Sequence, residues 1–155
     1  MEKDLMDEEL WNVPPVTFSF PVEWGKCREF ALALLDEDPA RPQTVEGSSP
    51  PVLPMPPIMA TCAFRYSPDN MPPSARLVER GLVDRARMLQ GGLEFEFHRP
   101  MLSGETLTVT DRLDRVHDKQ TSKGTLRFLE FETHFRSADG EPVCTIRTTN
   151  IERGD

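Results

Sequence analysis

The stretch "LQGGLEFEFHRPM", from Leu89 to Met101, decides the fold because its second half alternates between apolar and polar residues. This alternation predicts a strand with one buried face and one face at water or at a seam. The apolar face carries Leu93, Phe95 and Phe97, and the polar face carries Glu94, Glu96 and His98. Gly91 and Gly92 let the chain turn closely into what we expect to be a central strand, and Pro100 ends the pairing.

Three further strand-like runs follow: "ETLTVTDRLDRVHD", "TLRFLEFETHFRS" and "PVCTIRTTNIER". Turn sequences separate them, and "SADGEP" is the clearest hairpin signal. A short edge strand is expected earlier, where "PPVTFSFPV" places Val16, Phe18 and Phe20 at alternate positions. The sequence therefore predicts about five antiparallel strands.

Helices are expected before these later strands. "VEWGKCREFALALLDED" carries apolar residues at spacings of three and four, and Pro39 marks its end. A shorter helix is expected between Ser74 and Gln90, interrupted by Gly81. Helices segregated from a run of strands are typical of an α+β layout. We predict a hot-dog fold, in which a curved antiparallel sheet of about five strands wraps around one long helix.

The segment from Pro39 to Pro57 holds seven prolines and shows no periodicity, which predicts a long loop. Such a loop could gate a binding tunnel, act as a rigid ligand for a recognition domain, or cross the surface passively. The next residues, "IMATCAFRY", are apolar enough to return to the core, so no domain boundary is expected here. We expect a flexible acidic leader over residues 1–14 and a single domain over residues 15–155, with residues 39–57 as the proline-rich loop.

The chain is acidic, with 26 Asp and Glu against 18 Lys and Arg and a net charge of -8. This balance disfavours a broad contact with nucleic-acid phosphates or anionic lipid, although a local basic pocket remains open. Cys27, Cys62 and Cys144 lack metal-site spacing and are expected to be reduced, mostly buried thiols. No signal peptide and no run of roughly 18 apolar residues is found, so a cytoplasmic location is expected.

The stretch "LQGGLEFEFHRPMLSGETLTVTDRL" resembles the N-terminal MaoC-like dehydratase family, which typically shows Leu-His-Gly-Glu-Gln-Glu-Phe-Glu-Phe-His-Arg-Pro-Leu followed by Gly-Asp-Thr-Leu. "CREFALALLDEDP" and "TIRTTNIER" are also similar to the family, so the likeness spans Val16 to Arg153. The resemblance implies a component of an (R)-type enoyl-thioester hydratase or 3-hydroxyacyl-thioester dehydratase. It also implies a homodimer or a heterodimer with a second hot-dog subunit, an acyl-CoA or acyl-carrier-protein thioester as substrate, and neither a metal nor an organic cofactor.

In the catalytic relatives an Asp-x-Asn-Pro-x-His motif after the helix supplies a carboxylate and an imidazole that share one water. The corresponding positions here run from Asp36 to Arg41, so the aspartate is kept and the histidine is replaced. Arginine cannot exchange protons near pH 7 as imidazole does. The resemblance therefore implies the half that lacks the catalytic histidine, with Asp36 as the catalytic candidate, although Asp36 could equally be a plain acidic residue near a helix end.

Arg41, Arg65 and Arg99 are candidate contacts for the phosphates of coenzyme A or of a phosphopantetheine arm, because a guanidinium fork suits phosphate oxygens. Each could equally be a solvated or sheet-pairing arginine. Gly91 is a further substrate-binding candidate, since the reaction needs a backbone amide at the developing enolate.

No histidine of the chain is given a catalytic role. His98 is expected to be structural or to lie at an interface, and His117 and His134 are expected on the sheet surface without a nearby orienting carboxylate. Two alternatives remain open. One is a hot-dog thioesterase, which would need Glu94 or Glu96 turned toward an interface. The other is a catalytically silent partner that binds an acyl chain or stabilises an active subunit.

Overall fold

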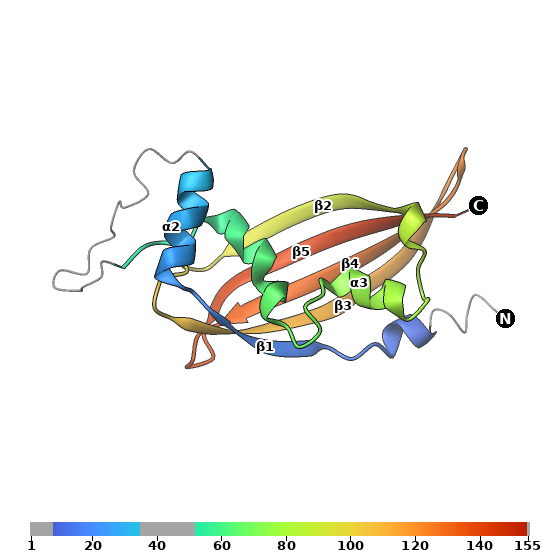
Figure 1. Ribbon diagram of the computed structural model, residues 1–155. Helices are drawn as coiled ribbons and strands as arrows, with labels where there is room; N and C mark the ends of the chain where they lie inside the picture. The colour runs from blue at the N-terminus through green and yellow to red at the C-terminus, as the bar shows by residue number, and fades with distance from the viewer. Residues whose placement is uncertain (1–7, 35–51, 155) are drawn as a thin grey trace.

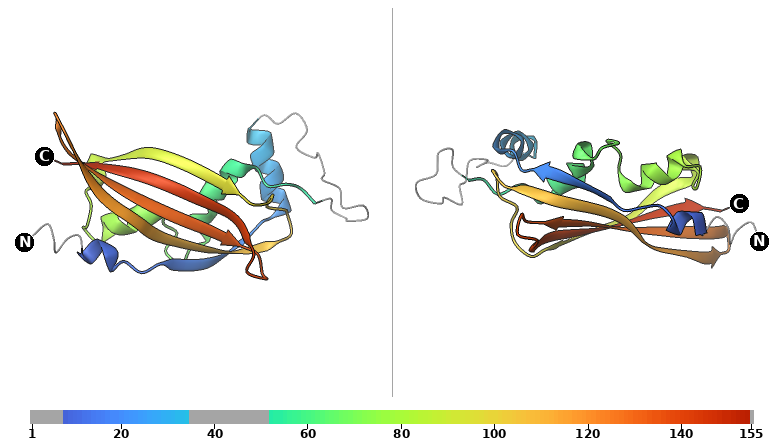
Figure 2. Two further views of the ribbon diagram at one scale, coloured as in Figure 1. Left: turned by 180° about the vertical axis from the view of Figure 1, so that it is seen from behind. Right: turned by 90° about the horizontal axis from the view of Figure 1, so that it is seen from below.

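The computed structural model describes residues 8–34 and 52–154. Its five-stranded sheet has the order β1-β3-β4-β5-β2, with antiparallel neighbours throughout. The strands are β1 (Val16–Pro21), β2 (Met88–Phe97), β3 (Thr106–Thr121), β4 (Gly124–Arg136) and β5 (Pro142–Arg153). Figures 1 and 2 show that the sheet is curved and that the helices lie on one of its faces, here called the inner face. The α+β hot-dog fold with a five-stranded sheet is confirmed.

Short helical segments cover the inner face. They are α2 (Trp24–Ala33), η1 (Pro57–Tyr66), α3 (Pro73–Glu79) and η2 (Arg85–Arg87). In Figure 1, α2 lies at one end of the sheet, η1 runs across its middle, and α3 lies toward the other end. The segment "IMATCAFRY" therefore returns to the core as η1, which occupies the central place that the sequence favoured for α2.

The burial of the two segments explains this arrangement. η1 buries Met59, Ala60 and Ala63 against the sheet, whereas α2 buries only Cys27 and Ala31. Leu34, the last residue of the expected apolar stripe, is 54% exposed, and Leu32 near it is 45% exposed. The apolar stripe of α2 is thus too short to cover the middle of the sheet.

The strand register places alternate residues of neighbouring strands in rows on one face. One inner row holds Phe97, Cys144, Phe135 and Val109, and the next holds Phe95, Ile146, Thr133 and Asp111. Glu94 and Glu96 lie opposite Arg147 and Thr145 on the other face, here called the outer face. The predicted alternation between two faces is confirmed, but the apolar face of β2 is not buried as expected, since Leu93 is 37% and Phe97 is 39% exposed. β2 is nevertheless an edge strand of this sheet, so the expectation of a central strand was wrong.

The helix expected between Ser74 and Gln90 ends early, at Glu79, and β2 already begins at Met88. Gly81 adopts a φ of 70°, a left-handed conformation that commonly terminates helices. The closing hydrogen bond runs from the Leu82 N–H to the Leu77 carbonyl at 3.0 Å. The interruption that the sequence showed is therefore the true helix end.

The glycine pair lies inside β2 rather than ahead of it. The pairing with β5 shifts between Gln90 and Gly92, which places Gly91 in a β-bulge. A Cβ at Gly91 would stand 2.7 Å from Cδ1 of Ile151, so this position favours glycine through close approach. The two glycines bend an edge strand and do not form a turn into a central one.

Parts of the proline-rich loop and of the N-terminal leader pack into the core. Leu53 and Met55 are buried, and the Met55 N–H donates to the Met101 carbonyl at 2.8 Å. Residues 39–51 of the proline-rich loop lie outside the described residues. Leu10 is fully buried and joins a second apolar cluster with Leu77, Leu82, Val83, Leu129 and Phe131. Of the leader expected over residues 1–14, the structure describes residues 8–14, and Leu10 packs there; residues 1–7 lie outside the described residues.

We predict that Leu10→Ala lowers the free energy of unfolding by about 2–4 kcal/mol, because a fully buried leucine leaves a cavity when truncated. Trp11→Ala is the matched control, since Trp11 is 51% exposed and its loss should cost far less. Urea unfolding followed by circular dichroism measures both. Equal, small losses for the two variants would show that the leader does not contribute to the core.

Candidate functional site

A cavity of about 280 Å³ lies between the inner face of the sheet, η1 and the start of α3. Ala60, Ala63 and Phe64 of η1 line one side, and the small alanines leave the space open. Gln90 and Leu93 of β2 line another side, so the cavity reaches the edge of the sheet. It is a natural place for a ligand because it is concave, largely apolar and equipped with a few polar groups.

The polar groups of this cavity come from three adjacent strands. They are Asp111 of β3, Thr133 of β4, and Thr148 and Asn150 of β5. Each takes an inward position in the register. The neighbours of Asp111 and Thr133 on the same face of their strands are apolar, whereas Thr148 and Asn150 form a polar run after Ile146. The sequence reasoning missed them. The available signal was a polar residue at an inward position of an alternating run, as with Asp111 in "LTVTD".

Asp111 is held by an arginine from α3. Arg76 Nη1 lies 3.2 Å from Asp111 Oδ2, and the two residues are 8% and 3% exposed. Burial raises the pKa of the Asp111 carboxyl, while hydrogen bonds from Thr133 and Arg76 oppose that rise. Arg76 also donates to Asp69 at 2.6 Å, which holds the pKa of Asp69 well below its usual range. The pair joins α3 to β3 and places a carboxylate at the cavity.

The site residues expected from the sequence do not converge here. Asp36 and Arg41 lie outside the described residues. Arg99 forms an ion pair with Glu105 at 2.8 Å and so stabilises the turn before β3. Gly91 lies near the start of β2 and Arg99 just after its end, roughly 25 Å apart at about 3.3 Å per strand residue.

Arg65 borders a second cleft, of about 380 Å³, between α2 and η1. Its side chain is exposed, and its guanidinium carbon lies 5.1 Å from the centroid of the Phe64 ring. Tyr66, beside it, donates a hydrogen bond to Glu23 at 2.9 Å. A phosphate contact of Arg65 stays a prediction.

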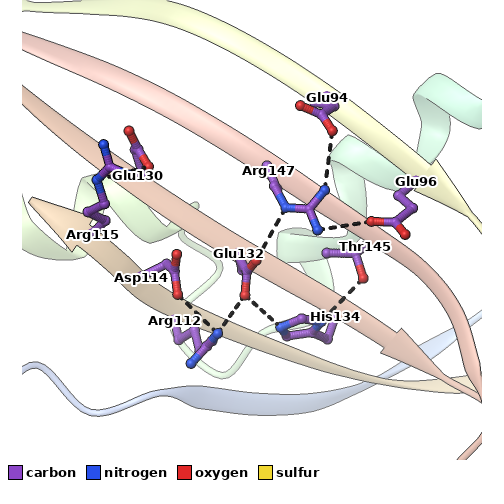
Figure 3. A network of polar contacts seen from close by, with 10 residues as sticks. All are labelled: Glu94, Glu96, Arg112, Asp114, Arg115, Glu130, Glu132, His134, Thr145 and Arg147. Atoms are coloured by element: carbon purple, nitrogen blue, oxygen red, sulfur yellow. Dashed lines mark hydrogen bonds and ion pairs between the residues drawn. The ribbon is translucent and has the colours of Figure 1, made fainter.

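The register places His117 and His134 on the outer face, and neither lines the cavity. Figure 3 shows His134 there, beside Glu132. His134 Nε2 is 3.0 Å from Glu132, and His117 Nδ1 is 3.6 Å from Glu130. The expectation that no carboxylate would lie near these rings was therefore wrong. His134 and Glu132 are two residues apart on β4. Their side chains therefore lie on the same face, because residues two apart on a strand share a face. His98, which follows the end of β2, is exposed.

Glu132 is the centre of the outer-face network (Figure 3). It accepts from Arg112 at 2.6 Å and from Arg147 at 3.3 Å, in addition to its contact with His134. The hydrogen bond from Arg112 is the main reason why the pKa of Glu132 lies below its usual value. Arg147 also contacts Glu94 at 3.2 Å and Glu96 at 2.9 Å. Opposite charges thus link four strands on the outer face.

Thiol and metal chemistry find little support in the described part of the chain. Cys27 and Cys144 are buried and free, and burial raises the pKa of each thiol to about 11. Neither is poised as a nucleophile at neutral pH. No group of three His, Cys, Asp or Glu side chains in the described ranges could hold a metal ion. No helix there has the length and apolar character needed to cross a membrane.

The fold and its inner cavity define a MaoC-like hot-dog domain. The chain belongs to the family described as FAS1-like, dehydratase domain region, whose model matches residues 13–146. A UPF0336 protein of Saccharopolyspora erythraea is 30% identical over 142 residues, covering 90% of this chain and 86% of that protein. A UPF0336 protein of Mycolicibacterium paratuberculosis is 29% identical over 133 residues, covering 85% and 72%.

Solved structures show the same fold at lower identity. The ChsH1-ChsH2 complex of Mycobacterium tuberculosis superposes with a TM-score of 0.70 at 19% identity, covering 98% of this chain and 91% of that chain. A MaoC-like dehydratase superposes with a TM-score of 0.70 at 21% identity, and the match covers 96% of this chain and 43% of that chain. The HadBC complex of Mycobacterium tuberculosis superposes with a TM-score of 0.60 at 21% identity, and the match covers 90% of this chain and 97% of that chain.

We predict that Glu132→Gln lowers the free energy of unfolding by about 1–2 kcal/mol at pH 7, because the arginines lose a charged acceptor. The pKa of Glu132 is lowered by folding, so its contribution is present above the ordinary carboxyl value of 4.5 and is lost as the pH falls through the folded value. The difference from wild type should therefore shrink below about pH 4. Urea unfolding at several pH values measures it.

Glu94→Gln is the control for this measurement, because the Glu94 side chain is 70% exposed and contacts the same Arg147. Glu94→Gln should lower the free energy of unfolding clearly less than Glu132→Gln does. Equal losses in the two variants, or a Glu132→Gln loss that stays constant from pH 7 to pH 3, would contradict the central place of Glu132.

Proposed function

We propose that this chain is a hot-dog component of an (R)-type enoyl-thioester hydratase or 3-hydroxyacyl-thioester dehydratase, the half that lacks the catalytic histidine. The observation that carries the proposal is the composition of the inner cavity, because no histidine is found among the described residues that line it. Asp36 stays the candidate carboxylate and lies outside the described residues. Moving protons at the α and β carbons needs an imidazole and a carboxylate at one water. A second hot-dog chain would supply the imidazole.

The comparisons support this proposal. The family is described as a dehydratase domain region. One fold neighbour, HadBC, is described as a 3R-hydroxyacyl-ACP dehydratase complex, and another is the R-hydratase PhaJ1 of Pseudomonas aeruginosa. HadBC and ChsH1-ChsH2 are complexes of named pairs. Pairing with a different hot-dog chain is therefore favoured over a homodimer.

The edge of β2 is the proposed docking surface for the second chain. Leu93 and Phe97 are 37% and 39% exposed on this strand. The Phe95 and Phe97 rings are stacked with their centroids 5.8 Å apart, which gives the edge a rigid apolar surface. An edge strand also offers unpaired backbone groups to an added strand. Because Leu93 also lines the cavity, a chain docked here would share its wall.

The alternatives receive unequal support. A silent partner that binds an acyl chain fits the same cavity and stays the second candidate. The thioesterase is not favoured, because Glu94 and Glu96 lie on the outer face and pair with Arg147. The nature of the thioester and the cytoplasmic location stay predictions.

The first experiment measures hydration of crotonyl-CoA by the purified chain and by its mixture with a MaoC-like chain encoded beside it that carries the Asp-x-Asn-Pro-x-His motif. We expect hydration by the mixture that exceeds the sum of the two separate chains by about tenfold or more, because each half supplies part of the site. The rate of absorbance loss of the enoyl thioester is the readout. Full activity of this chain alone would overturn the proposal.

The second experiment tests the docking surface with Phe97→Glu, which places a charge on the β2 edge. We expect the affinity for the partner to fall about tenfold or more, because an apolar contact is replaced by a desolvated charge. Trp11→Glu is the control, since Trp11 is 51% exposed and lies outside β2. Sedimentation velocity or calorimetry gives the affinities. Unchanged affinity of Phe97→Glu would place the interface elsewhere.

A further inference from the structure

The inner cavity has an unusual floor for the acyl site of a thioester enzyme. A plain alkyl chain needs only apolar walls. The floor of this cavity nevertheless carries Asp111, Thr133, Thr148 and Asn150. Asp111 is 3% and Asn150 is 9% exposed. Polar groups at such buried positions destabilise a fold unless they find hydrogen-bond partners.

Some of these polar groups have hydrogen-bond partners in the protein and others have none in the described ranges. Asp111 is bonded by Arg76 and Thr133. The side-chain amide of Asn150 and the hydroxyl of Thr148 form no side-chain hydrogen bond with any residue in the described ranges. Their polar atoms are not fully enclosed by protein, and both residues line the cavity. An asparagine amide has two N–H donors and a carbonyl acceptor, and a carboxylate has room for more than two bonds. The cavity therefore presents donors and acceptors that no described protein group uses.

We infer that the cavity binds an acyl group that carries a hydroxyl or carbonyl oxygen remote from the thioester, an inference that rests on the proposed function. The oxygen of such a group accepts from the Asn150 amide, and a hydroxyl also donates to Asp111. The walls from Phe64, Leu93, Phe131 and Ile146 contact the carbon skeleton. A cavity of about 280 Å³ suits a compact group, on the order of ten non-hydrogen atoms if each takes about the volume of a water molecule.

The same geometry discriminates against a plain alkyl group. An alkyl end would displace water from Asn150 and Asp111 and leave their polar atoms unpaired. Sites built to bond a substrate oxygen reject analogues that lack it far more strongly than apolar sites reject an added methylene. We expect a preference of about tenfold or more for the oxygenated substrate.

The experiment compares two trans-2-enoyl-CoA thioesters of equal length, one ending in a methyl group and the other in a hydroxymethyl group. Binding to this chain alone is measured by calorimetry, and kcat/KM is measured for its complex with the histidine-bearing partner. We expect the hydroxylated thioester to bind about tenfold more tightly and to react with the higher kcat/KM. Equal or reversed preference, or no binding of either thioester to the chain, overturns the inference.

Asn150→Leu is the diagnostic variant, because leucine keeps a similar volume and removes the amide. It should reduce the preference to about onefold, largely by weakening the hydroxylated thioester. Thr149→Val is the control, since Thr149 is the next residue of β5 and lies on the outer face in the register. A preference that survives in Asn150→Leu would also overturn the inference, and circular dichroism confirms that each variant is folded.

The two proposals fail in different ways. Hydration of crotonyl-CoA by the mixture without any preference between the long thioesters would remove the inference and leave the proposed function. A mixture without hydratase activity would remove the proposed function. The binding preference of the chain alone would then still decide what the cavity recognises.

Discussion

The packing of η1 against the inner face of the sheet is the contact on which the rest of the structure depends. An antiparallel sheet can leave one face in water only if the other face is covered. η1 supplies that cover at the middle of the sheet through Met59, Ala60 and Ala63, which join the main core cluster with Phe135 and Ile146. The two alanines let η1 approach the strands closely while they fill little volume. The cavity beside η1 exists because these two side chains are small.

The outer face reinforces the same register by different means. A shift of one residue in β4 would turn Phe131 outward and Glu132 into the core, which would be costly on both faces. Glu132 receives arginines from β3 and β5, Arg112 and Arg147, only in the observed pairing. The apolar rows inside and the charged rows outside therefore specify one arrangement of strands.

The sequence predicted the strands because a period of two is a local property that survives in any sheet with one buried face. It could not decide whether α2 or η1 takes the central place, because that choice depends on how each apolar stripe fits a curved surface. Leu10 shows the same limit, since nothing in an acidic leader predicts that one leucine joins a distant cluster. Of the site, Asp111 left a signal as a polar residue at an inward position between Val109 and Leu113, whereas Asn150 left none because Thr148 and Glu152 beside it on the same face are polar. The pairing of Arg76 with Asp111 left none, because the two residues are distant in the chain and meet only through the packing of α3.

The proposed docking edge and the cavity are two parts of one surface, because Leu93 is exposed on β2 and lines the cavity with Gln90. If a second chain docks along β2, it covers this opening and contributes to the wall. A ligand in the cavity then contacts both chains and binds the assembled form more tightly than the separate chain. By linkage, the ligand strengthens assembly by the same factor by which assembly strengthens ligand binding. A polar cavity floor and an apolar strand edge, which have no chemistry in common, are thus expected to act together.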